Sequence, residues 1–533
     1  MTKLLEINHI QTLCFAKGFS PARLNVATSP FRISRRGGGG YCSNACIPYR
    51  LKFTCYATLS AVVKEQASDF SGKEAALLVD ELRSNFNSGR TKSYEWRISQ
   101  LQNIARMIDE KEKCITEALY QDLSKPELEA FLAEVFYIIS MSRFFTAFHL
   151  STVESLWYFS RFLDFEYKII LYACNQRVKE LDGSRNVLSV EPVIGAIAAG
   201  NAVVLKPSEI APAASSLLAK LFSEYLDNTT IRVIEGGVPE TTALLDQKWD
   251  KIFFTDLSLL LKHKIVKFRS HTLIVVLWLK VAARRIIAGK WACNSGQACI
   301  GVDYVITTKD FASKLIDALK TELETFFGQN ALESKDLSRI VNSFHFKRLE
   351  SMLKENGVAN KIVHGGRITE DKLKISPTIL LDVPEASSMM QEEIFGPLLP
   401  IITVQKIEDG FQVIRSKPKP LAAYLFTNNK ELEKQFVQDV SAGGITINDT
   451  VLHVTVKDLP FGGVGESGIG AYHGKFSYET FSHKKGVLYR SFSGDADLRY
   501  PPYTPKKKMV LKALLSSNIF AAILAFFGFS KDS

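Results

Sequence analysis

Short apolar runs alternate with longer segments of helical spacing between residues 202 and 255, and few folds accommodate such an alternation. The apolar runs suit buried strands and occupy Ala202–Lys206, Thr230–Ile234 and Ile252–Thr255. Between them, one helix is expected from Ala211 to Tyr225 and another up to about Gln247. Strands that alternate with helices predict a parallel, doubly wound sheet, so the fold class is α/β.

Helical and strand-like patterns continue on both sides of this region. Helices are expected at Glu74–Phe86, Tyr94–Leu123, Val281–Ala292, Asp310–Phe327 and Asp336–Glu355. Strand-like runs recur at Thr378–Val383, Leu398–Val404 and Gly444–Asn448. A chain of 533 residues exceeds what one compact core needs, so two or more domains are expected.

Most of the net charge of +10 lies in the first 60 residues, which hold eight basic residues against the single acid Glu6. Because the rest of the chain is close to neutral, no nucleic-acid partner is expected. The segment is also rich in Ser and contains the run Gly37–Gly40, a composition typical of a transit peptide. Residues 1–59 are therefore interpreted as a chloroplast transit peptide, with a disordered basic tail as the alternative. Mitochondrion and cytoplasm are the alternative locations.

The cysteines divide in the same way. Four of the eight lie in the terminal segment, and the other four are Cys114, Cys174, Cys293 and Cys299. None of these four has a C-x-x-C partner, so neither a disulfide framework nor a metal site is expected. A thiol with a chemical task remains an option.

Cys299 closes the sequence Asn-Ser-Gly-Gln-Ala-Cys, directly after a predicted helix. A thiol is a competent nucleophile only as the thiolate, which needs a site that lowers its pKa. A turn that contains a glycine supplies backbone N–H groups beside the sulfur, and these groups also suit an oxyanion. Taken alone the pattern is weak, because most buried cysteines only fill space.

Three further groups of residues have chemical potential. Lys206 and Glu209 stand at the carboxyl end of a predicted strand, where open α/β sheets bind ligands; the alternative is an exposed strand end followed by a helix N-terminal acid. Glu393 and Phe395 lie in Glu-Glu-Ile-Phe-Gly-Pro and could present a carboxylate and a ring to a planar cofactor, or only form a turn. The glycine-rich segment 460–468 indicates a loop where backbones approach closely.

Together these four groups resemble the aldehyde dehydrogenase superfamily, in particular a plant chloroplast-type member of its class 3 branch. The matching strings are NAVVLKPSE, GGVPETTALL, NSGQACIGVDY, QEEIFGPLLP, GGITINDTVLH and LPFGGVGESGIGAYHGKFSYETFSHKKG. The resemblance covers most of 61–134, 188–255 and 281–500 in the family's order.

The resemblance implies a Rossmann-like cofactor domain with a parallel sheet, an α/β catalytic domain, a small oligomerisation arm and a homodimer. The NAD(P)-binding domain would span 60–280, with interruptions at 135–187 and 256–280, and the catalytic domain 281–447. Residues 448–495 would return to the cofactor domain and form the arm, and 496–533 would be a C-terminal tail.

The resemblance also implies the reaction, which is the oxidation of aliphatic or lipid-derived aldehydes to carboxylic acids with NAD or NADP. Cys299 would attack the aldehyde and pass through a thiohemiacetal and a thioester. Lys206 and Glu209 would hold the adenosine ribose and Glu393 the nicotinamide ribose. Phe395 would position the nicotinamide ring, and Asn448 would help to shape the substrate site.

Two segments, 135–187 and 256–280, do not match the family. The family has a Trp-Asn-Phe-Pro type segment near the end of the first, whose Asn stabilises the oxyanion, and a Leu-Glu-Leu-Gly-Gly strand near the second, whose Glu is the general base. Residues 256–280 contain no Glu. Our hypothesis is replacement sequence, such as a translated intron or a misjoined exon; the alternative is a divergent variant. The alternative function is accordingly an impaired or inactive dehydrogenase-like chain.

The C-terminal tail is almost wholly apolar from Ile519 to Phe529 and follows the basic run Lys506–Lys508. This apolar stretch is shorter than the ~20 residues that a membrane-spanning helix needs. A helix that covers the substrate funnel or makes a peripheral membrane contact is expected, with packing against the body as the alternative.

Overall fold

The computed structural model of this chain describes residues 70–146, 164–166, 169–174, 185–255, 270–274, 279–493, 495–516, 520, 523 and 524. Of 164–166, 169–174, 185–188 and 270–274 it describes the backbone alone. The predicted transit peptide lies outside these residues, as does the apolar tail 519–529 apart from 520, 523 and 524.

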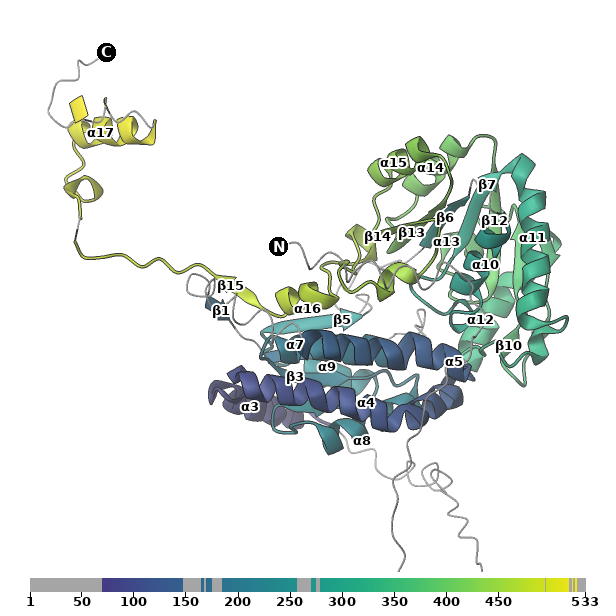
Figure 1. Cartoon of the computed structure of the whole chain (residues 1–533), viewed down its shortest axis with the longest axis horizontal. Helices are drawn as coiled ribbons and strands as arrows, with labels where there is room; N and C mark the ends of the chain where they lie inside the picture. The colour runs from purple at the N-terminus through teal and green to yellow at the C-terminus, as the bar shows by residue number, and fades with distance from the viewer. Residues whose placement is uncertain are drawn as a thin grey trace, which may run out of the picture. The chain divides into compact units, whose positions relative to one another are not determined.

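A four-stranded parallel sheet carries the region of alternating strands and helices (Figure 1). Its strand order is β4 (Ile231–Val233), β3 (Ala202–Lys206), β2 (Ile169–Cys174) and β5 (Lys251–Thr255). The connecting helices are α8 (Pro212–Tyr225) and α9 (Val238–Leu245). The predicted parallel arrangement is confirmed, with the predicted bounds correct to within a few residues.

Helices cover both faces of this sheet. Successive residues of a strand point to opposite faces, so the contacts of β3 show which helices cover each face. Val203 and Leu205 pack in one buried cluster with α4 (Tyr94–Leu123), α7 (Arg185–Ala198) and α8. Ala202 and Val204 pack in another with α3 (Gly72–Asn87) and α9. A parallel sheet buried on both faces explains why β3 is apolar at nearly every position.

The helices that precede the sheet begin where their sequences supply caps. Ser71 accepts a hydrogen bond from Glu74 N, and its own N–H donates to Glu74 Oε2 at 2.8 Å, which forms a capping box for α3. Ser93 caps α4 through Trp96 N. The helix α4 ends at Ser124, which has φ 50°, two residues before Pro126.

A seven-stranded sheet follows, parallel except for β8. Its order is β14 (Gly444–Ile447), β13 (Ala422–Phe426), β6 (Ser270–Ile274), β7 (Tyr304–Thr308), β12 (Leu398–Val404), β11 (Thr378–Leu381) and β8 (Ile362–His364). β6 lies before residue 281, where the sequence analysis starts the catalytic domain, but among the described strands it pairs with β13 and β7 of this second sheet.

This second sheet is also covered on both faces. Ala422, Tyr424 and Phe426 pack on the side of α10 (Leu279–Lys290) and α11 (Lys309–Phe327). Ala423 and Leu425 pack on the side of α12 (Ser343–Lys354), α14 (Ile407–Arg415) and α15 (Lys430–Asp439). In Figure 1, α11 runs beside β7 and β12.

The two segments that do not match the family each contribute a central strand. β2 pairs with β3 on one side and β5 on the other, and β6 lies between β13 and β7. Both strands come from runs rich in β-branched and aromatic residues, a composition that fits a buried strand whatever its origin. The sequence prediction missed both of them, together with β7 and β13.

The predicted helix Asp336–Glu355 is wrong in its first seven residues, because α12 begins at Ser343. The side chain of Asn342 accepts a hydrogen bond from His345 N at 2.9 Å and fixes the start of the helix there. Smaller elements are α5 (Glu127–Ala130), α13 (Ser388–Gln391), α16 (Gly474–Thr480), β9 (Ile368–Thr369), β10 (Lys374–Ile375), and β1 (Asp164–Glu166) paired with β15 (His483–Lys485).

The tail contributes one helix, α17 (Pro505–Leu515), which Thr504 caps through Lys507 N. Exposed apolar side chains on and after it include Leu514, Leu515 and Phe520. Within the described residues, no helix has both the length and the hydropathy needed to cross a bilayer.

Candidate active site

Cys299 lies in a tight loop after α10 that its own polar side chains hold in shape. Ser295 Oγ donates to Ser338 O at 2.6 Å. Gln297 Nε2 donates to Arg339 O at 2.9 Å, and Gln297 Oε1 accepts from Val341 N at 3.0 Å. The loop is thus bound to the segment 338–341, which fixes the path of the backbone into Cys299.

The same loop touches the segment that carries Glu393 and Phe395. A Cβ atom on Gly296 would lie 2.3 Å from Gly396 O, so the two backbones are in close contact. Trp291 Nε1 donates to Pro397 O at 2.7 Å and joins the same two segments in the buried core. The sequence predicted both segments as functional, and the structure brings them together.

Gly296→Ala is expected to destabilise the fold more than a glycine replacement made at a similar φ in open space. Gly296 has φ 78°, and its added Cβ would clash with Gly396. Gly89 has φ 85°, and a Cβ added there would have nothing within 4 Å, so Gly89→Ala is the matched control. The clash should add about 1–3 kcal/mol beyond the control. Urea unfolding of both variants measures this difference, and equal losses would contradict the close contact.

Cys299 itself is half-buried, and its neighbours come from three parts of the chain. It packs against a small buried cluster of Leu123, Val341 and Phe395, which Ile210 also joins. Ile210 follows Glu209 directly, so this cluster connects the Cys299 loop with the carboxyl end of β3. Cys299 and Phe395, predicted to be nucleophile and ring-positioning residue, therefore share one apolar neighbourhood.

Lys206 and Glu209 form an ion pair at the carboxyl end of β3. Lys206 is fully buried, and its Nζ lies 3.0 Å from Glu209 Oε2 and 2.8 Å from Gly236 O. Gly236 has φ 142° and leads into α9. An ammonium group has three N–H donors, and these two contacts use two of them. The third donor and the partly exposed carboxylate suit two sugar hydroxyl groups.

Glu393 and Phe395 are both buried, in a stretch that main-chain contacts hold on both sides. Ile394 N donates to Asp303 Oδ1 at 3.0 Å. Arg348 donates to Ile394 O at 2.6 Å and to Glu393 O at 3.3 Å. Phe395 has φ 49°, a conformation that a bulky residue adopts only where the surroundings enforce it. Neither Asp303 nor Arg348 was predicted: Asp303 lies in the matching string NSGQACIGVDY with no role assigned to it, and Arg348 lies outside the matching strings.

Asn448 follows β14 and uses its side chain within the fold. Its Nδ2 donates to Thr427 O at 2.9 Å, and its Oδ1 accepts from Thr427 N at 2.7 Å. Asn448 has φ 61° and so turns the chain sharply after the strand. Its predicted part in shaping the substrate site stays a prediction, and any such part would act through this turn.

A buried cluster of acidic and basic side chains, which the sequence analysis missed, contacts the Cys299 loop through the main chain of Asn294. Glu129 Oε1 accepts from Asn294 N at 2.8 Å, and burial raises the pKa of Glu129. Lys125 and Glu134 are fully buried, with Nζ 2.9 Å from Oε1. Burial alone would lower the pKa of Lys125, but the attraction of Glu134 and Glu129 outweighs it and raises that pKa. Helical spacing alone gave no signal for these contacts.

A second buried cluster of titratable residues joins α7 to the glycine-rich segment. His473 Nε2 lies 3.2 Å from Glu191 Oε2, and both side chains are fully buried. The His473 ring stacks on Phe461 with centroids 5.0 Å apart and planes at 14°. Burial first, and the charge of Glu191 second, raise the pKa of the Tyr137 hydroxyl far above its usual range. The cluster therefore connects α7 with the segment that contains Phe461 and His473.

His453 belongs to the same region, and its buried ring should make the folded state less stable as the pH falls. Burial first, and the charge of His473 second, lower its pKa from 6.5 to about 4. The unfolded state binds this proton more readily than the folded state. The contribution of His453 to the free energy of unfolding is therefore fully present above pH 6.5 and is lost as the pH falls toward 4, a loss on the order of 3 kcal/mol. Urea unfolding at both ends of this range should show a smaller loss for His453→Gln than for the wild type; equal losses would contradict the shift.

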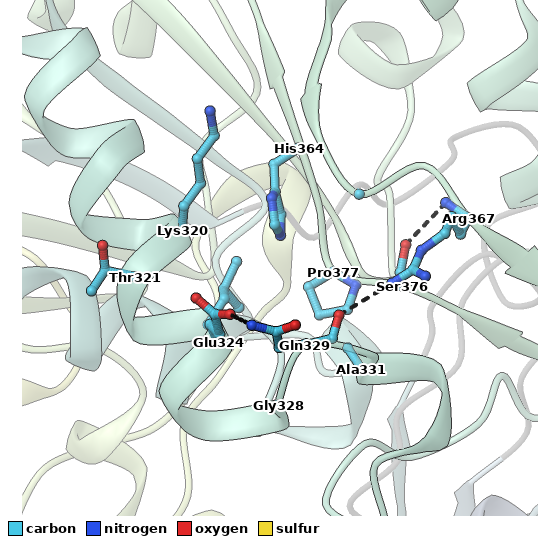
Figure 2. Close-up of a pocket in the computed structure, with 12 residues that line it drawn as sticks. Lys320, Thr321, Glu324, Gly328, Gln329, Ala331, His364, Arg367, Ser376 and Pro377 are labelled. Atoms are coloured by element: carbon cyan, nitrogen blue, oxygen red, sulfur yellow. Dashed lines mark hydrogen bonds between the residues drawn. The ribbon is translucent and has the colours of Figure 1, made fainter.

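A surface pocket of about 470 Å³ lies apart from these residues, between α11 and β8 (Figure 2). Its walls include Lys320, His364 and Arg367. Burial first, and then the charges of Lys320 and Arg367, lower the pKa of His364. No predicted site residue lines this pocket, and Glu324 offsets part of its positive charge.

Comparison with known proteins separates the same segments of the chain as the sequence analysis. The family model described as "Aldehyde dehydrogenase family" matches residues 186–258 and 273–487. The match begins at the end of 135–187 and is interrupted within 256–280, the two segments that the sequence sets apart.

Curated relatives match over nearly their whole lengths. "Aldehyde dehydrogenase family 3 member I1, chloroplastic" of Arabidopsis thaliana is 84% identical over 557 aligned positions, which include 100% of both chains. Because this chain has 533 residues, at least 24 of those positions have no counterpart in it. "Aldehyde dehydrogenase, dimeric NADP-preferring" of Rattus norvegicus is 38% identical, with 80% of this chain and 98% of the relative covered.

Solved structures give the same result for the fold. The structure titled "Substrate bound state of Staphylococcus Aureus AldH" has a TM-score of 0.73 and 34% identity, and the match covers 82% of this chain and 99% of that chain. An NAD-dependent enzyme from Sinorhizobium meliloti, 19% identical with a TM-score of 0.67, shares the fold.

Proposed function

The chain belongs to the aldehyde dehydrogenase family, and we propose that it oxidises aliphatic and lipid-derived aldehydes to carboxylic acids with Cys299 as nucleophile and NAD or NADP as cofactor. One observation supports this most strongly. The loop of Cys299 is bonded to its neighbours through Ser295 and Gln297, and it packs beside Phe395. This arrangement supports a nucleophile at Cys299 beside a flat apolar surface for a cofactor ring.

The residues at the end of β3 fit the proposed cofactor. The third N–H of Lys206 and the carboxylate of Glu209 would hold the adenosine ribose, and Glu393 would hold the nicotinamide ribose. Glu209 disfavours a 2′-phosphate electrostatically, although the rat relative is named as NADP-preferring. When bound, the cofactor supplies the acceptor for the hydride that leaves the substrate carbon.

The chain's own part in the reaction begins with the thiolate of Cys299. The sulfur adds to the aldehyde carbon, and the carbonyl electron pair moves to oxygen, where the Cys299 N–H and a side-chain amide would stabilise it. Loss of hydride leaves an acyl group joined to the sulfur as a thioester. Water then attacks the acyl carbon, the carbon–sulfur bond breaks, and a base takes the proton.

A second candidate, an impaired or inactive chain, is favoured by one specific observation. Residues 256–280, where the family carries its general-base Glu, contain none, and the family match is interrupted there. Asn186 lies outside the family's oxyanion motif, so that donor is not transferred to it. A chain that forms the thioester but releases it slowly would combine both candidates.

A series of straight-chain aldehydes tests the substrate class. Burial of the aldehyde's carbon chain against apolar side chains should favour each added methylene by up to ~0.8 kcal/mol, or about fourfold in first-turnover efficiency. First-turnover rates of NADH and NADPH formation from propanal to nonanal measure this trend. Rates that do not change with chain length would contradict an aliphatic substrate, and the better cofactor would be read from the same traces.

The proposal also includes the location of the protein, its oligomeric state and a membrane contact. Import into the chloroplast is supported by the basic, Ser-rich segment 1–59 and by the chloroplastic relative. Assembly as a homodimer is supported by the rat relative, which is named as dimeric. Peripheral membrane contact through Lys506–Lys508 and the apolar residues after them would be tested by salt and carbonate washes of isolated membranes.

A further inference from the structure

The Cys299 loop contains three polar side chains, and two of them hold the loop in place. Ser295 and Gln297 bond to main-chain atoms of residues 338–341. The main chain of the third, Asn294, is also engaged. Its N–H donates to Glu129 Oε1 at 2.8 Å, and its carbonyl accepts from Gln297 Nε2 at 2.9 Å. Only the Asn294 carboxamide therefore has no part in the scaffold that the described residues form.

This carboxamide is buried without a partner. Asn294 is 1% exposed, and within the described part of the chain neither its Nδ2 nor its Oδ1 has a hydrogen-bond partner. A buried amide without partners is costly and is rare in folded proteins. Asn294 also has φ 49°, which adds backbone strain. A polar group held in this way, five residues before a nucleophile, indicates that a ligand atom is its partner.

The chemistry at Cys299 needs such a donor. The family takes its side-chain amide from a Trp-Asn-Phe-Pro segment, and residues 183–187 do not contain it. The thiohemiacetal oxyanion therefore requires a donor from elsewhere. Among the polar side chains of the Cys299 loop, the amides of Asn294 and Gln297 are the available types, and that of Gln297 is already bonded.

We propose that the Asn294 carboxamide is the side-chain donor to the oxyanion that forms when Cys299 adds to a carbonyl group. This inference rests on the proposed role of Cys299. The sulfur–carbon bond forms, the carbonyl π pair moves to oxygen, and Asn294 Nδ2–H donates to that oxygen without transferring its proton. The same step occurs with an ester, so the donor can be tested without any cofactor.

Two variants and p-nitrophenyl acetate test the proposal. Asn294→Gly removes the amide and relieves the strain of φ 49°, so it should fold at least as well as the wild type. Asn294→Ala also removes the amide, without the added backbone freedom of glycine. Each should slow acylation of Cys299, read as the p-nitrophenolate burst, by about 10²–10³-fold. Asn330→Ala, an exposed asparagine, is the matched control and should acylate at the wild-type rate.

Alkylation by iodoacetamide separates this role from a structural one, because alkylation needs the thiolate but creates no oxyanion. In both variants the alkylation rate of Cys299 should stay within about twofold of the wild type. Acylation of Asn294→Gly at nearly the wild-type rate would overturn the proposal. Equal losses in both assays would also overturn it, because the amide would then only maintain the loop. If wild-type protein showed no more burst than Cys299→Ala, the proposed nucleophile itself would fail.

Discussion

Cys299→Ala is expected to lower NAD(P)H formation from an aliphatic aldehyde by at least about 10⁴-fold in the first turnover. An alanine has no atom that can add to the carbonyl carbon, so neither the thiohemiacetal nor the thioester can form. The loss should appear in the rate of the chemical step, because the proposed ribose contacts of Lys206 and Glu209 would be unchanged. Single-turnover absorbance traces with enzyme in excess measure this rate directly.

Cys293→Ala is the matched control, because Cys293 lies in the same turn region and six residues from Cys299. It should retain the first-turnover rate to within about threefold, since buried cysteines generally act as small packing residues. If both variants were inactive, the turn as a whole would be sensitive and the assignment would be unsupported. If Cys299→Ala matched the wild type, the nucleophile would lie elsewhere.

The second large effect concerns release of the product. Because residues 256–280 supply no Glu, hydrolysis of the thioester should be slower by about 10²–10⁴-fold than with a positioned base. Stopped-flow traces should therefore show a burst of NAD(P)H, close to one per Cys299, followed by a slow steady state. The burst amplitude counts the thioester formed, and the later slope gives the hydrolysis rate.

Hydroxylamine provides the control for this prediction. It attacks a thioester without a protein base, but it also condenses with free aldehyde, so it is added to acyl-enzyme that has been separated from aldehyde by rapid gel filtration. The acyl group should then leave the wild type faster in hydroxylamine than in buffer alone. A linear trace with no burst and no response to hydroxylamine would contradict slow deacylation. In that case either the chain has another base or the first chemical step is the slow one.

The sequence predicted the parallel sheet around β3 because each strand there is short, apolar and followed by a turn signal. It missed β2 and β6, because both lie in stretches with no helix–strand alternation around them. Their pairing partners are far along the chain: β6 lies between β13 and β7. Such pairing depends on which gap in the sheet a strand can fill, and local periodicity carries no information about it.

The candidate site shows the same limit at the level of single contacts. The Asn-Ser-Gly-Gln-Ala-Cys string identified the loop, but only the structure shows that Gln297 binds residues 339 and 341 while the Asn294 amide has no partner among the described residues. The close contact of Gly296 with Gly396 joins two strings about 100 residues apart. Arg348 and Asp303 bond to main-chain atoms of Ile394, next to Phe395, and the sequence strings alone do not reveal these contacts.

Peptide mapping of acid-quenched enzyme tests the central claim most directly, since the claim is that the acyl group is carried by Cys299. Protein mixed with an aliphatic aldehyde and NAD(P) would be quenched within the first turnover and digested. The account predicts that the peptide containing Cys299 gains the mass of the acyl group, and that this gain is absent from Cys299→Ala. An unmodified Cys299 peptide in protein that has formed NAD(P)H, or the same gain on a peptide containing Cys114, would contradict it.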